Sequence, residues 1–223
     1  MNQQDLMNGL DKIYGLVVEG IPHVTPPITV LAEKYLQKGN SVEEAAIKLI
    51  NAQIAKSTAS GFVTGLGGIL TIPVSLPANL ATVLYFQLRM IAGVAYMAGF
   101  DVHSGQVRSL TYMCLAGLTV EQLLKNTGIK VGTRITKSVA AKLPAKVTAS
   151  INQKVGYRLF TKFGNRSALS IGKAVPILGG VISGGIDMIE TQLIAERAFN
   201  MFIGGEGDHA ADFIEFEVLD EEE

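Results

Sequence analysis

Hydrophobic residues recur three or four positions apart along most of the chain, whereas strict alternation is confined to its C-terminal end. Near the N-terminus, for example, Leu6, Leu10 and Ile13 stand at the spacing of one helix face. Apolar and acidic residues alternate clearly only over residues 213–219. The pattern therefore predicts an all-α fold.

Glycine, proline and capping residues divide this pattern into about eight helices. Gly20 and Pro22 end the first helix, and Ser41 with Glu44 three residues later resembles a capping box at the start of the third. The predicted helices cover residues 1–18, 25–38, 41 into a glycine cluster, 78–98, 106–124, two basic segments separated by Pro144, and 168–202.

The most apolar stretch lies between residues 57 and 101. Its first 32 residues, Ser57–Leu88, contain no charged side chain, and Arg89 is the first charge after them. About 20 apolar residues suffice to cross a bilayer. However, four glycines between residues 61 and 68 and prolines at 73 and 77 weaken or break helices. We therefore expect a core hairpin of two apolar helices that meet at a proline corner; insertion of this hairpin into a membrane is the alternative.

Composition supports a helical domain that is either deeply buried or in contact with a membrane. Charged residues make up 17% of the chain, below the usual quarter, and mean hydropathy is +0.32. Cys114 is the single cysteine, which excludes an internal disulfide, and its apolar surroundings indicate a core position. The N-terminal residues lack the basic-then-apolar order of a signal peptide, so we expect a cytoplasmic protein.

We divide the chain into N-terminal helices (residues 1–40), a helical domain (41–203) and an acidic tail (204–223). The tail carries nine acidic residues and no basic one after residue 205. It is predicted either to remain solvated or to cover a basic face of the domain.

Residue patterns that support catalysis or metal binding are missing from the sequence. The histidines at 23, 103 and 209 are far apart and have no cysteine nearby. Gly65-Leu66-Gly67 is not followed by the lysine of a phosphate-binding loop. We therefore assign no catalytic residue, metal or cofactor, and expect a protein that is not an enzyme.

Arg89 is the one charged residue of its predicted helix. Burying an unpaired guanidinium costs several kcal/mol, so an acceptor is expected. Asp187 and Glu190, in the apolar last helix, are the predicted partners. A structural ion pair is the simpler interpretation; a polar cleft around Arg89 in a helical hydrolase is the enzymatic alternative.

Positive charge is concentrated in one part of the chain. Between Glu121 and Asp187 there are eleven Lys and Arg residues and no acidic residue. Like charges on one helix face repel, which points to a surface for anionic lipid; nucleic acid is the less favoured polyanion and a merely solvated face remains open. The predicted lipid-binding residues are Lys130, Arg134, Lys137, Lys154, Arg158, Lys162 and Arg166.

The stretch GLGGILTIPVSLPANLATVLYFQLRMIAGVAYMAGFD, residues 65–101, resembles the signature region of the EcsC protein family. Further similarity extends over about residues 57–202, although Asn79 stands where an aspartate is expected. The family takes its name from a bacterial operon that also encodes an ABC transporter linked to secretion, and no catalytic activity is established for it. The resemblance implies a bacterial helical domain with a membrane-related role and a membrane protein, such as a transporter, as partner.

Overall fold

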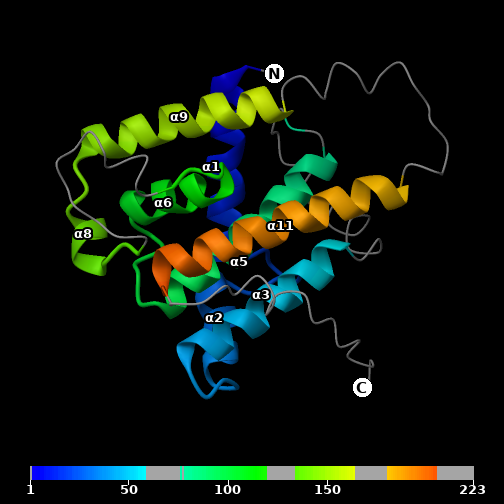
Figure 1. The fold of residues 1–223 in the computed structure, drawn as a ribbon, viewed down its shortest axis with the longest axis vertical. Coiled ribbons are helices and arrows are strands. Elements are labelled where there is room, and N and C mark those ends of the chain that lie inside the picture. Colours follow the sequence, from blue (N-terminus) through cyan, green and yellow to red (C-terminus); the bar gives the residue numbers. More distant parts are fainter. Residues whose placement is uncertain (1, 59–75, 77, 120–133, 164–179, 205–223) are drawn as a thin grey trace.

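The computed structural model describes residues 2–58, 76, 78–119, 134–163 and 180–204. This part of the chain forms one all-α domain of eight helices without a strand (Figure 1), which confirms the predicted fold class. Ile21 and Thr25 form an isolated β-bridge. The helices are α1 (Gln3–Glu19), α2 (Ile28–Leu36), α3 (Val42–Thr58), α5 (Ala78–Met97), α6 (Gly105–Leu115), α8 (Lys137–Ala141), α9 (Ala145–Phe163) and α11 (Gly180–Phe202).

Helix α5 is the centre of the fold. It contacts α1, α2, α3, α6 and α11 (Figure 1). Leu80–Met97 is long and apolar enough to cross a membrane, but 83% of this window is buried inside the protein. A helix that is apolar on all sides must be covered on all sides, and here five other helices provide the cover.

Local sequence determines most helix boundaries as predicted. Asn2 and Asp5 form a reciprocal capping box on α1, and Ser104 accepts a hydrogen bond from the backbone N–H of Val107 at the start of α6 (3.2 Å). At α3 the Ser41 hydroxyl accepts from Glu44 N–H (3.1 Å), but the Glu44 carboxylate accepts from Asn40 N–H (2.8 Å) rather than from Ser41. The predicted capping box is therefore only half formed: Ser41 caps the Glu44 N–H, but the Glu44 carboxylate binds the N–H of the residue before Ser41.

Two predicted helices are shorter in the structure. Helix α6 ends at Leu115 instead of residue 124, because Gly117 adopts a positive φ of 69° and the N–H of Leu118 bonds back to the Met113 carbonyl (3.0 Å). Helix α2 begins at Ile28 because Pro27, and not Thr25, is its N-terminal cap. The first arm of the apolar hairpin beyond Thr58, its proline corner, residues 168–179 and the acidic tail lie outside the described residues.

Residues 1–40, which we set apart from the sequence, contribute to the same hydrophobic core as α5. Leu6, Leu10 and Ile13 of α1 are fully buried. The Tyr14 hydroxyl donates to the Val102 carbonyl (2.8 Å) and so joins α1 to the turn before α6. On the other side, α1 and α6 together support α9.

Candidate functional site

The basic segment around Pro144 forms helix α9, which lies along one edge of the molecule (Figure 1). Its N-terminal turn is closed by hydrogen bonds from Val147 N–H and Thr148 N–H to the Pro144 carbonyl (2.9 and 3.1 Å). The side that packs on α1 and α6 carries apolar residues four positions apart: Ile151, Val155 and Leu159, each at most 1% exposed. The opposite side of α9 therefore faces solvent.

The solvent side of α9 carries positive charge around an exposed aromatic ring. Lys146, Lys154 and Arg158 are exposed, and the Tyr157 side chain is 66% exposed. Viewed down the helix axis, with 100° between successive residues, Tyr157 lies between Lys146 and Lys154. Arg158 lies next to Lys154 in the same view. We call these four residues the α9 surface.

A groove of about 480 Å³ runs beside the α9 surface. It is lined by Gln153, Lys154, Tyr157, Arg158 and Thr161 of α9, together with Gln3 and Leu118. The Gln3 side-chain amide donates to the Gln153 carbonyl (3.2 Å), so the N-terminal turn of α1 forms one wall. The groove thus combines an aromatic ring, two cations and neutral polar groups.

The other predicted lipid-binding residues are distributed unevenly. Arg134 and Lys137 are exposed, but they lie against the turns at Gly204 and Gly99, where their side chains would meet an added Cβ at 2.7 and 2.9 Å. Lys130 and Arg166 lie outside the described residues. The predicted set of lipid-binding residues omitted Lys146. This residue precedes Lys154 by eight positions and therefore lies on the same side of α9.

Lys162 differs from the rest of the predicted set. Its ammonium group forms a salt bridge with Glu190 of α11 and lies 5.0 Å from the centre of the Phe163 ring. Both charged side chains of the pair are about 70% covered. Lys162 therefore ties α9 to α11, and its charge is largely neutralised.

Arg89 is 3% exposed and contacts neutral acceptors. Its Nη1 donates to the Tyr85 hydroxyl (2.9 Å) and its Nη2 to the Pro26 carbonyl (2.8 Å), while the Tyr85 hydroxyl lies 2.6 Å from Thr25 Oγ1. Burial lowers the pKa of the Arg89 guanidinium.

The predicted pairing of Arg89 with Glu190 is wrong, because Glu190 pairs with Lys162. The side chain of Asp187, the other predicted partner, lies outside the described residues. Helix geometry explains the error. Helix α11 meets α5 at Gln87, whose amide donates to Thr191 Oγ1 (3.1 Å). Arg89, two residues later, points to the far side of α5, about 200° away.

Metal-binding and nucleophilic side chains do not form a site among the described residues. No cluster of three His, Cys, Asp or Glu side chains there could hold a metal ion. Cys114 is buried beside Met201 (Sγ–Sδ 3.5 Å), and burial raises the pKa of its thiol to about 12. Since the thiolate is the reactive form, Cys114 is a packing residue.

No family model, curated protein or solved structure matches this chain.

Proposed function

We propose that this protein docks peripherally on anionic membranes through the α9 surface. The observation that carries the proposal is Tyr157, which is 66% exposed among Lys146, Lys154 and Arg158 in a part of the chain without acidic residues. An exposed tyrosine with flanking cations suits the headgroup region, where the ring enters the interface and the cations meet phosphates.

The energetics agree with reversible attachment. Each basic residue near an anionic bilayer contributes about 1 kcal/mol, so the three cations of the α9 surface contribute about 3 kcal/mol at low salt. The apolar side of α9 is already buried against α1 and α6. Binding therefore requires neither unfolding of α9 nor insertion of α5.

The aromatic residues of α9 favour lipid over nucleic acid. Binding to single strands depends on several aromatic rings on which bases stack. Phe160 packs partly buried against the core, and Phe163 contacts Lys162, which leaves Tyr157 as the exposed ring of α9.

The resemblance to the EcsC family is consistent with this function. It supports a place on the cytoplasmic face of a bacterial membrane and a membrane protein, such as a transporter, as partner. The protein would then act by binding and not by catalysis.

Vesicle co-sedimentation tests the proposal. Phosphatidylcholine vesicles with and without phosphatidylglycerol are compared at low and high salt. We expect binding only to the anionic vesicles, and Lys154→Gln with Arg158→Gln should weaken it about 30-fold, since about 2 kcal/mol is lost. Raising the salt concentration should release the protein.

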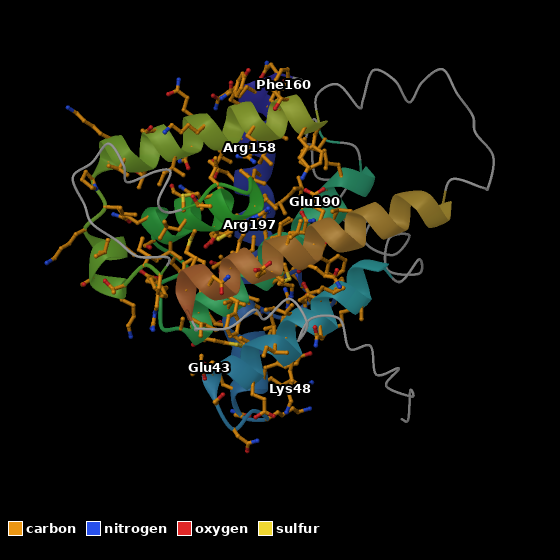
Figure 2. The ribbon with its side chains drawn as sticks, in the orientation of Figure 1. Glu43, Lys48, Arg158, Phe160, Glu190 and Arg197 are labelled. Carbon is orange, nitrogen blue, oxygen red and sulfur yellow. The ribbon has the colours of Figure 1, made fainter. Side chains whose placement is uncertain are left out.

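The matched control is Lys38→Gln with Lys48→Gln, which changes net charge equally at the other end of the molecule. Figure 2 shows Lys48 on α3, far from Arg158 on α9. Equal losses in the two double variants would overturn the proposal in favour of a bulk charge effect. A single-stranded oligonucleotide that competes fully with vesicles, and binds more tightly than they do, would replace lipid by nucleic acid.

A further inference from the structure

The seam between α2, α3 and α5 contains a buried cation that has no carboxylate partner among the described residues. Arg89 forms no ion pair with any Asp or Glu of the described residues, and two of its N–H groups donate to a hydroxyl and a carbonyl oxygen. The sequence has no acidic residue between Glu44 and Asp101, a range that includes nearly all of α3 and the whole of α5. Neither α5 nor α3 beyond its first turn therefore offers a carboxylate to Arg89.

A second buried polar group lies at the same level of the seam. Gly93 marks the register, since a Cβ there would lie 3.0 Å from Leu49 of α3 and 3.3 Å from Ile28 of α2. Helices α3 and α5 run antiparallel (Figure 1). Gln53 follows Leu49 by one turn of α3, and Arg89 precedes Gly93 by one turn of α5. In an antiparallel pair these two residues therefore lie at the same level.

Gln53 is unsatisfied in this position. Its side chain is 2% exposed, and among the described residues neither its amide nitrogen nor its amide oxygen has a hydrogen-bond partner. A buried amide without a partner destabilises the folded protein, because it has lost its hydrogen bonds to water. Such a group in a folded protein calls for an explanation, and a bound ligand provides one.

Two lysines extend the positive charge from the seam to the surface. Lys56, one turn beyond Gln53 on α3, is exposed. Desolvation lowers its pKa, and the neighbouring charges of Arg89 and Lys34 lower it further. None of Arg89, Lys56 and Lys34 forms an ion pair within the described part of the chain.

We propose that the seam between α2, α3 and α5 binds a phosphate group, held by Arg89, Lys56 and the Gln53 amide. Arg89 has five N–H donors in a planar fork, and two of them are used by Tyr85 and Pro26. The remaining donors suit two oxygens of one phosphate. Lys56 adds a mobile charge, and the ligand satisfies the Gln53 nitrogen.

This site is separate from the α9 surface, so the two proposals stand or fall independently. A phosphate group is supplied either by a soluble phosphate ester or by a lipid headgroup. Phosphatidic acid presents such a group at a membrane surface, whereas inorganic phosphate presents it in solution. The experiment therefore uses both.

Thermal unfolding with increasing inorganic phosphate, at ionic strength held constant with sodium chloride, tests the site. Replacing Arg89 would also disturb Tyr85 and Pro26, so the exposed Lys56 is the better target. We expect Tm to rise with the logarithm of phosphate concentration once the site begins to fill. Lys56→Gln should weaken the apparent affinity about tenfold, because it removes a charge-assisted hydrogen bond to the phosphate. Lys48→Gln, two turns earlier on α3 and paired with Glu44, should leave the affinity unchanged.

The second arm measures binding to phosphatidylcholine vesicles that contain phosphatidic acid. A tenfold loss on Lys56→Gln here as well as with inorganic phosphate assigns the site to a lipid headgroup; a loss with inorganic phosphate alone assigns it to a soluble phosphate. The proposal is overturned if phosphate raises Tm no more than chloride does. It is equally overturned if Lys48→Gln and Lys56→Gln weaken phosphate binding by the same factor.

Discussion

The guanidinium of Arg89 donates a hydrogen bond to the hydroxyl of Tyr85, one turn earlier on α5, over 2.9 Å. The same hydroxyl lies 2.6 Å from Thr25 Oγ1. Tyr85 thus joins the buried cation to the turn before α2, and both residues are nearly inaccessible to solvent. The stability of the protein should depend on this hydroxyl.

Tyr85→Phe should destabilise the protein by about 1–3 kcal/mol, because it leaves a donor of the buried Arg89 without its partner and removes the contact with the Thr25 hydroxyl. The measurement is the free energy of unfolding from urea denaturation. The matched control is Tyr157→Phe, which removes the same atom from an exposed side chain and should change stability by less than about 0.5 kcal/mol. Similar values for the two variants would show that the Tyr85 hydrogen bonds do not stabilise the fold.

Stability should fall at alkaline pH partly because of Tyr14. Burial raises the pKa of Tyr14 to about 12, whereas an unfolded tyrosine titrates near 10. Between these values the unfolded chain has lost a proton that the folded protein keeps, so each further pH unit costs about 1.4 kcal/mol. The contribution is fully present below pH 10 and is lost as the pH rises to 12.

Chemical denaturation at several pH values between 9 and 12 measures this slope. Tyr14→Phe lowers stability at every pH, because its bond to Val102 is lost, but its curve should be flatter above pH 10. Tyr157→Phe should keep the slope of the unmodified protein. A Tyr14→Phe curve parallel to that of the unmodified protein would contradict the assignment.

Two glycines of the α1 region should respond in opposite directions to alanine. Gly15 is exposed within α1 and has no atom within 4 Å of an added Cβ, so Gly15→Ala should stabilise by up to about 1 kcal/mol through helix propensity. Gly20 ends α1 at φ 79° and ψ 174°, a region essentially restricted to glycine. An added Cβ there would also lie 2.7 Å from backbone atoms of Thr25 and Pro27.

Gly20→Ala should therefore destabilise by at least about 1–3 kcal/mol. Thermal unfolding of both variants under the same conditions provides the comparison. A loss of stability on Gly15→Ala, or no change on Gly20→Ala, would mean that the turn between α1 and α2 is built differently from the one described.

Breaking the salt bridge between Lys162 and Glu190 should strengthen membrane binding if the α9 surface is the docking site. Glu190→Gln removes the carboxylate that pairs with Lys162, which adds a cation beside Arg158. We expect anionic vesicles to bind this variant up to about fivefold more tightly at low salt, since one additional basic residue contributes about 1 kcal/mol. Glu43→Gln changes net charge equally on α3, away from α9 (Figure 2), and should have a smaller effect. Equal effects would leave net charge as the cause.

Much of the helical framework is determined by local sequence. The all-apolar character of residues 78–98 predicted that α5 would be the core helix, and α5 does contact five others. Pro144, Ser104 and Gly20 mark boundaries because their conformations or side chains act on neighbouring backbone groups. Such effects extend over a few residues, so they can be read without knowledge of the fold. The length of α6 was misjudged, because an apolar pattern continues past a glycine that ends the helix.

Which side chains pair with one another and which are exposed to solvent, in contrast, is decided by the tertiary structure. The sequence presented Asp187 and Glu190 as equivalent acceptors for Arg89, yet α11 meets α5 through Gln87, and Glu190 reaches Lys162 instead. Likewise, Tyr157 and Phe160 are both aromatic residues of the same helix, and the packing of α9 on α1 and α6 exposes the first and partly covers the second. The physical reason is that side-chain pairing depends on which faces of distant helices meet, and the hydrophobic pattern of one helix does not specify its neighbours.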